Sequence, residues 1–146
     1  MSYNAEAVLG PEGILAKHLA NYEYRNEQII MSNFVYDALQ SETHAIIEAG
    51  TGVGKSLAYL LPLIYYTVEE NKLAVVATHT LALQEQLFHK DIPLLNEVLP
   101  FEFQVEVFKG RSNYLCLRRW QEFIQSQGNQ LGLVDGLEIL KQWVES

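Results

Sequence analysis

The sequence predicts an α/β fold in which helices cover both faces of a parallel β-sheet. Three short segments rich in apolar residues, 45–49, 73–77 and 104–108, have the length of buried strands. Segments with helical spacing of apolar residues lie between them, and each connection is long enough for a crossover between parallel strands. This alternation of strand and helix is typical of a parallel sheet.

The remaining regular segments are predicted to be helices. They are expected over residues 14–21, 26–39, 54–70, 81–89, 115–127 and 136–144. Residues 1–13 carry glycine and proline turn signals and predict an N-terminal loop. Pro62 falls inside one expected helix, where it removes a backbone donor. Thr80 and Asp135 precede two others and are expected to cap them.

Composition limits the class of protein. The chain has 146 residues, of which 49% are hydrophobic and 19% charged, so it can bury the core of one domain. A single cysteine excludes an internal disulfide framework and an all-cysteine metal site made within this chain. The longest uncharged apolar run, 57–68, is shorter than a membrane span, and no signal-peptide pattern opens the chain. We therefore expect a cytoplasmic protein without membrane contact.

The strongest motif follows the first expected strand. It comprises Ala49, Gly50, Thr51, Gly52, Val53, Gly54, Lys55 and Ser56, and it matches the phosphate loop with alanine in place of the first glycine. The three glycines are expected to permit unusual torsions, and the backbone N–H groups with the next helix's N-terminus would hold an anion. Lys55 would reach the β- and γ-phosphates, and the Ser56 hydroxyl would bind Mg²⁺. A plain glycine-rich turn is the less favoured reading, because an apolar strand and a long helix flank the motif.

A second acidic group, which would hold Mg²⁺ and place water, is not evident. Apolar runs precede Asp37 and Asp135, but the first has the pattern of a helix face and the second that of a helix cap. No Asp-Glu pair occurs in the chain. The pattern indicates half of a nucleotide site, so this chain is expected to bind nucleotide weakly and to turn over little.

A local basic stripe contrasts with the net charge of −8. Residues 107–121 contain no acidic side chain, and their basic and aromatic members include Lys109, Arg111, Tyr114, Arg118 and Arg119. Interleaved cations and aromatics suit single-stranded nucleic acid, although an ordinary solvated surface gives the same composition. The four histidines have no metal-ligand spacing and are expected to be ordinary surface or packed residues.

Four strings in order, residues 25–28, 48–56, 75–87 and 109–116, resemble bacterial DinG-type helicases, relatives of the eukaryotic XPD-like enzymes in superfamily two. The last string, Lys-Gly-Arg-Ser-Asn-Tyr-Leu-Cys, is the most discriminating. The resemblance implies that residues 14–146 form part of the first RecA-like lobe of an ATP-dependent DNA helicase, truncated at the start of a cysteine-containing insertion. The second RecA-like lobe would lie outside this chain.

The resemblance also implies an activity. Such a helicase couples ATP hydrolysis to 5′ to 3′ translocation on single-stranded DNA in repair or replication. Lys55 would stabilise charge on the transferring phosphoryl group as the catalytic residue. Gln28 corresponds to an adenine-sensing glutamine, and Arg25 would stack on the base or steady a phosphate. From composition alone, both are also consistent with solvated helix residues.

Further residues match DNA-binding and cluster positions of that family. Thr78, Thr80 and Gln84 match a motif that contacts the DNA backbone, although Thr80 as a simple cap and Gln84 as a solvated residue stay open. Three members of the basic stripe, Lys109, Arg111 and Tyr114, would hold the strand. Cys116 matches the first of four iron–sulfur ligands, and since no other cysteine is present, a cluster is expected only in a longer parent.

Two other functions compete with a helicase. A small phosphate-loop kinase would need an arginine-bearing lid and its own acidic residue, and neither is evident in the sequence. A nucleotide-binding module that does not act on DNA is the other alternative. The 109–116 string argues against both.

Overall fold

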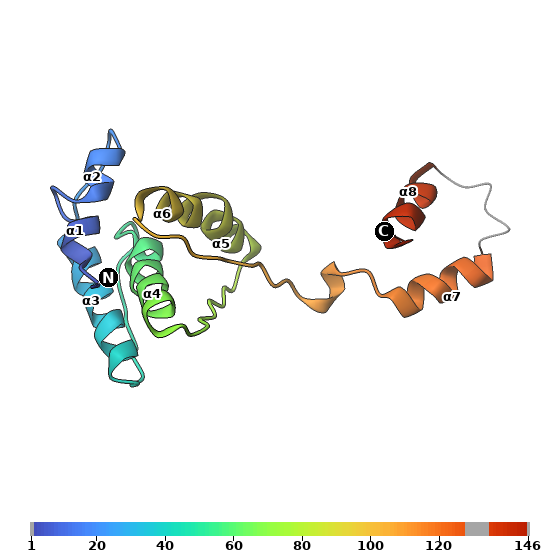
Figure 1. Ribbon diagram of the computed structural model, residues 1–146, viewed down its shortest axis with the longest axis horizontal. Coiled ribbons are helices and arrows are strands. Elements are labelled where there is room, and N and C mark those ends of the chain that lie inside the picture. Colours follow the sequence, from blue (N-terminus) through green and yellow to red (C-terminus); the bar gives the residue numbers. More distant parts are fainter. Residues whose placement is uncertain (1, 128–134, 146) are drawn as a thin grey trace. The chain divides into compact units, whose positions relative to one another are not determined.

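The computed structural model describes residues 2–127 and 135–145, and all regular elements in them are helical. In chain order (Figure 1) they are α1 (Ala5–Leu9), α2 (Ile14–His18), α3 (Asn26–Gln40), α4 (Lys55–Glu70), α5 (Leu81–Gln86), the π-helical turn η1 (Leu87–Asp91), α6 (Ile92–Val98), the 3₁₀ turn η2 (Arg111–Asn113), α7 (Leu117–Gln127) and α8 (Asp135–Glu145). The chain divides into two compact units, Met1–Val105 and Glu106–Ser146, and each is described by itself.

The core of the first unit lies around the pair α3 and α4, and α1 packs onto α3. Its fully buried apolar side chains include Leu9, Leu15, Leu61 and Leu95. Removing such side chains from water is the main favourable term in folding. The α3–α4 pair therefore anchors the loop that precedes α4.

The expectation of a loop over residues 1–13 is wrong for the segment that forms α1. Asn4 caps this helix, since its Oδ1 accepts a hydrogen bond from the backbone N–H of Ala7 at 3.1 Å. Val8 and Leu9 of α1 are buried in the core. Five residues are too few to show a helical period, which is why the pattern did not reveal the helix.

The two long helices agree with the prediction to within one residue at each end. The expected 26–39 is α3, and the expected 54–70 is α4. The latter continues through buried Pro62, whose ring nitrogen cannot donate to the carbonyl of Ala58. Burial of the apolar face of α4 outweighs that missing hydrogen bond.

The predicted strands are not observed, because no residue that the structure describes lies in a β-strand. The three segments, all within the described part of the chain, lie in irregular stretches, and no backbone hydrogen bond joins the first two of them to each other. Side chains expected in a sheet interior are instead open to solvent: Ile46 is 99% exposed, Leu73 91% and Phe108 90%. Helices close their hydrogen bonds locally, whereas a strand requires a neighbouring strand.

The helix expected over residues 81–89 begins as predicted but extends further. Thr80 caps α5, its Oγ1 accepting from the N–H of Leu83 at 3.3 Å. The chain then passes through η1 into α6, which ends at Val98. Pro93 lies directly after η1 and has no N–H to donate to the preceding turn, and the chain stays helical past it.

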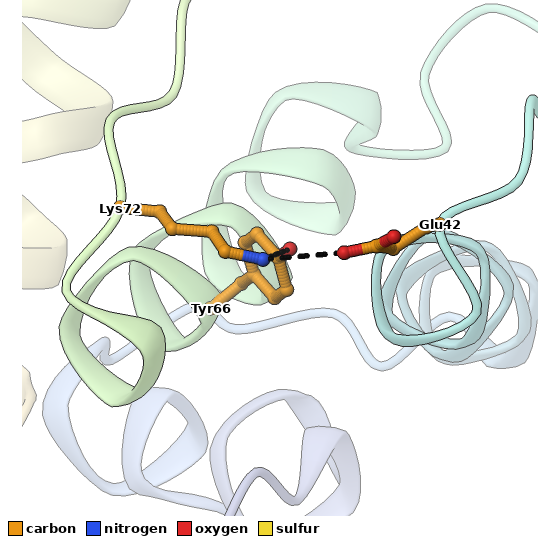
Figure 2. Close-up of polar contacts among 3 residues, drawn as sticks. All are labelled: Glu42, Tyr66 and Lys72. Atoms are coloured by element: carbon orange, nitrogen blue, oxygen red, sulfur yellow. Dashed lines mark hydrogen bonds and ion pairs between the residues drawn. The ribbon is translucent and has the colours of Figure 1, made fainter.

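The carboxyl ends of α3 and α4 are joined by a polar cluster, which we call the Glu42–Tyr66–Lys72 cluster. Figure 2 shows the Lys72 side chain reaching past the Tyr66 ring toward Glu42. Lys72 Nζ donates to the Tyr66 hydroxyl at 2.7 Å and lies 3.5 Å from Glu42 Oε1. These contacts, Tyr66 first, raise the pKa of the Lys72 ammonium. The cluster lies where residues 43–50 and 72–78 begin.

The second unit contains η2 and two longer helices. The expected 115–127 and 136–144 correspond to α7 and α8, and Asp135 is the first residue of α8 rather than its cap. Within residues 2–127 and 135–145, no helix has both the length and the apolar content to cross a membrane.

Candidate nucleotide-binding site

The phosphate-loop motif connects the irregular stretch 43–50 to the start of α4. Gly52 and Gly54 have φ angles of 82° and 76°, a region that side-chain-bearing residues rarely adopt. Gly50 has no such angle, and a Cβ there would meet only Val53 Cγ2 at an ordinary 3.9 Å. The expected torsional role of glycine is thus confirmed at Gly52 and Gly54 and not at Gly50 in this conformation.

Gly54 is also the residue that precedes α4, so the free N–H groups of a 16-residue helix begin at the loop. These groups and the helix dipole together favour an anion at this point. The loop geometry is therefore suited to phosphate.

Lys55 is the first residue of α4, and its exposed side chain folds back over the loop. Its Nζ donates to the carbonyl oxygen of Ala49 at 2.9 Å. A neutral carbonyl is a weaker partner for an ammonium than a phosphate oxygen. The lysine charge is thus held at the loop by a contact that a phosphate can replace.

Ser56 lies in the first turn of α4, with its side chain near the Tyr59 hydroxyl. Burial raises the pKa of the Tyr59 phenol, and the nearby Ser56 side chain opposes that rise without cancelling it. Ser56 is partly exposed beside the loop, which fits a magnesium ligand of the kind that its position in the motif predicts.

Gln28 is buried, with 2% of its surface exposed, and it contacts the phosphate loop directly. Its Nε2 donates to the carbonyl oxygen of Gly54 at 2.9 Å, while its Oε1 is buried and has no hydrogen-bond partner. The family resemblance implies a contact between Gln28 and the base, and it does not predict this contact with Gly54. A contact between positions 26 residues apart leaves no local signal in the sequence.

Arg25 precedes α3 and lies near Gln28, whose backbone N–H bonds to the Arg25 carbonyl oxygen at 3.1 Å. Its guanidinium pairs with the Glu23 carboxylate at 2.5 Å. Both side chains of this pair reach solvent. The pair is therefore free to rearrange at low energetic cost.

Two of the predicted DNA contacts lie close together at the start of α5. Thr78 Oγ1 donates to the Thr80 carbonyl oxygen at 3.3 Å, and Thr80 is exposed as well as capping the helix. Gln84 lies one turn further along α5 and is partly buried. The cap role of Thr80 is confirmed, and a DNA role for these three residues stays a prediction.

The predicted strand-binding residues of the second unit lie around η2. The Tyr114 hydroxyl accepts a hydrogen bond from the backbone N–H of Lys109 at 2.8 Å, so these two are brought together. Lys109, Arg111 and Tyr114 are all exposed. Further along, Arg118 pairs with Glu122 at 2.7 Å on α7, so part of the basic stripe is neutralised.

Cys116 is a free, partly exposed thiol just before α7. The backbone N–H groups of Arg119 and Arg118 lower the pKa of this thiol. Within the described ranges, no group of three or more histidine, cysteine, aspartate or glutamate side chains could hold a metal ion. These residues therefore do not supply the ligand set of an iron–sulfur cluster.

Comparison with known proteins identifies relatives of this chain. Residues 30–126 match the DEAD/DEAH box helicase family. The chain is 32% identical over 125 residues to the protein named 3'-5' exonuclease DinG of Bacillus subtilis, an alignment that covers 86% of this chain and 13% of that protein. It is 34% identical over 134 residues to the ATP-dependent DNA helicase YoaA of Escherichia coli, covering 91% of this chain and 20% of that protein.

A third relative, named 3'-5' exonuclease DinG, comes from Staphylococcus aureus and is 42% identical over 94 residues, or 64% of this chain and 10% of that protein. The chain thus spans between 10% and 20% of the length of these three relatives. No solved structure matches the chain.

Proposed function

Because the chain belongs to the DEAD/DEAH box helicase family, a family of RecA-like phosphate-loop fold, we propose that it forms the triphosphate-binding part of an ATP-dependent DNA helicase related to DinG and YoaA. The single observation that carries this proposal is the phosphate loop at the start of α4. Gly52 and Gly54 have left-handed backbones there, and Lys55 lies over the loop.

Each residue of the loop has a role in this proposal. The backbone N–H groups of the loop and of the first turn of α4 bind the phosphate oxygens. Lys55 exchanges the Ala49 carbonyl for a phosphate oxygen and stabilises charge on the transferring phosphoryl group. Ser56 holds Mg²⁺, which neutralises phosphate charge when it is bound with ATP.

Base recognition is proposed for Gln28 and Arg25. The unpaired Oε1 of Gln28 is an acceptor that would suit the exocyclic amine of adenine, once the side chain has moved enough to expose it. Arg25 would exchange its pairing with Glu23 for the base or a phosphate.

We propose DNA-binding residues in each of the two units. Thr78, Thr80 and Gln84 of the first unit would bind the sugar–phosphate backbone, as hydroxyls and amides commonly do. In the second unit, Lys109 and Arg111 would neutralise phosphates, and the exposed Tyr114 ring would stack on a base. Translocation from 5′ to 3′, a role in repair, and an iron–sulfur ligand role for Cys116 in a longer protein stay predictions from the resemblance.

A parallel sheet is part of the same proposal. The exposed apolar side chains of residues 45–49 and 73–77 are the kind that a sheet interior buries. The Glu42–Tyr66–Lys72 cluster links the points where the two stretches begin through the side chains of Glu42 and Lys72 (Figure 2). Pairing with further strands would complete the sheet.

Calorimetric titration of the 146-residue chain with Mg²⁺ and ATP tests the proposal. We expect saturable but weak binding, which Lys55→Ala weakens further, together with negligible hydrolysis. Absence of binding by the unaltered chain would contradict the proposal. Phosphoryl transfer to a small acceptor without DNA would favour a kinase instead, an alternative that family membership does not favour.

A further inference from the structure

The buried amide of Gln28 ties α3 to the point where the phosphate loop becomes α4. The carbonyl oxygen of Gly54 accepts two hydrogen bonds, one from Gln28 Nε2 at 2.9 Å and one from the backbone N–H of Ala58 at 3.3 Å. The second of these is the first helical hydrogen bond of α4. The side chain of Gln28 therefore supports the same peptide group that starts the helix.

Gln28 also occupies the space beside the Gly54 α-carbon. A Cβ built on Gly54 would overlap Gln28 Nε2 and lie 3.2 Å from Gln28 Cδ, so the Gln28 amide would have to move away from Gly54. The φ angle of Gly54 is 76°, a second and independent reason for glycine. The Gln28 amide can therefore pack against position 54 only where that residue is glycine.

Of the two polar atoms of the Gln28 amide, only the nitrogen forms a hydrogen bond. Gln28 Oε1 is buried without a hydrogen bond, an arrangement that native structures rarely tolerate. An apolar side chain of similar length would fill this space without leaving an acceptor unpaired. The property that glutamine adds here is the N–H donor to Gly54.

The direction of the N–H groups in a phosphate loop depends on the backbone angles of its glycines. We infer that Gln28 is a positioning residue for the phosphate loop, which holds Gly54 in its left-handed conformation and so strengthens binding of a triphosphate whatever base it carries. The contact is made to backbone and is present without nucleotide, so its effect does not pass through adenine. The inference rests on the proposed function of the loop as a triphosphate site.

Inorganic tripolyphosphate, which has no base, separates this role from base recognition. We expect Gln28→Met to weaken binding of magnesium tripolyphosphate to the full chain by about tenfold, the effect of losing one hydrogen bond, and to weaken ATP binding at least as much. Gln104→Met, the same substitution at an exposed position of the first unit, should leave both affinities unchanged.

The possible results distinguish the inference from the proposed function. If Gln28→Met weakens ATP binding but leaves tripolyphosphate binding unchanged, Gln28 acts through the base and the inference is wrong. The same holds if the unaltered chain binds ATP but not tripolyphosphate. If the unaltered chain binds neither, the proposed function fails and the inference fails with it.

A double-mutant cycle with Gly54→Ala provides a second measurement. Alanine at position 54 should weaken tripolyphosphate binding in the unaltered chain through both the strained φ angle and the clash with Gln28. In a Gln28→Ala background only the strain remains, so the fold-loss caused by Gly54→Ala should be smaller. Equal losses in the two backgrounds would overturn the inference. Circular dichroism checks that each variant keeps its helices. If Gln28→Met unfolds, the affinities of Gln28→Ala for tripolyphosphate and ATP are compared with those of the unaltered chain instead.

Discussion

The Tyr36 hydroxyl donates a hydrogen bond to Oε2 of Glu69, with 2.8 Å between the two oxygens, and so links α3 to α4. Burial, helped by the neighbouring carboxylate of Glu69, raises the pKa of Tyr36 to about 12. Burial likewise raises the pKa of Tyr3 to about 12, and Tyr3 stacks on Tyr36 with ring centroids 4.0 Å apart. The helix pair that carries the phosphate loop is therefore in contact with two phenols that resist ionisation.

Alkaline pH should consequently destabilise the chain in a defined window. The folded-state pKa of Tyr36, about 12, exceeds its ordinary value of 10.0, so the folded state holds this proton more tightly than the unfolded state. The stabilisation is fully present below pH 10 and is lost as the pH rises toward 12. Urea titrations at about pH 9 and about pH 11.5 should show a lower free energy of unfolding at the higher pH.

Tyr36→Phe should flatten this pH dependence and also lower stability at the lower pH. The substitution leaves the Glu69 carboxylate without its phenol donor, at a cost of about 1–3 kcal/mol. Tyr24→Phe, at an exposed tyrosine before α3, should change neither quantity. An unchanged slope in Tyr36→Phe would show that the folded-state pKa of Tyr36 is not raised above its unfolded-state pKa.

Leu61→Ala should destabilise the first unit strongly. The Leu61 side chain is fully buried on α4, and removing it leaves a cavity that costs about 2–5 kcal/mol. Leu73→Ala should have almost no effect, because Leu73 is largely exposed. Free energies of unfolding from urea titration compare the two, and a large decrease in Leu73→Ala would indicate that this segment is packed in solution.

The contrast between these two leucines shows how far the sequence could predict the structure. Helices α3 and α4 were predictable because their hydrogen bonds are local and their apolar spacing is regular. The segments around Ile46 and Leu73 have strand composition, but strand formation depends on pairing partners that local pattern does not supply.

The candidate nucleotide site likewise has a part that the sequence predicts and a part that it does not. The phosphate loop was predictable because its chemistry lies in consecutive residues, Ala49 to Ser56. The Gln28–Gly54 contact was not, since it depends on how α3 packs against the start of α4. The extension of α5 through η1 into α6 was not predictable, because a proline such as Pro93 is typical of a helix end, whereas here the chain stays helical past it.

Cys116 should react with iodoacetamide at a lower pH than an ordinary cysteine does. Two backbone N–H groups at the start of α7 favour its thiolate and lower its pKa. The alkylation rate measured against pH should therefore have its midpoint below 9.0, the value of an ordinary thiol. Arg118→Ala should shift this midpoint only slightly, because backbone donors are the leading cause. A midpoint above the ordinary value would mean that α7 does not begin beside Cys116 in solution.

Lys55→Ala should weaken nucleotide binding without affecting the fold. The Lys55 side chain is exposed and donates to the Ala49 carbonyl, so the substitution removes little packing. Loss of a charge-assisted hydrogen bond to phosphate should weaken Mg²⁺–ATP binding by about ten- to a hundredfold in calorimetry. Lys17→Ala, at an exposed lysine of α2, is the control and should bind as the unaltered chain does. Equal affinities of Lys55→Ala and Lys17→Ala for Mg²⁺–ATP would show that Lys55 does not contact the nucleotide.

Combined replacement of Lys109 and Arg111 by alanine should weaken binding of a fluorescein-labelled oligothymidine. Both side chains are exposed around η2, and each is expected to neutralise one phosphate. The slope of log affinity against log salt should therefore fall in magnitude by roughly 1.4 in fluorescence anisotropy, about 0.7 for each phosphate of a single strand that is no longer neutralised. Replacing Lys17 and Lys90, two exposed lysines of the first unit, removes the same charge and should leave that slope unchanged. If both double variants reduce the slope equally, binding reflects net charge alone, and the residues around η2 do not form a DNA site.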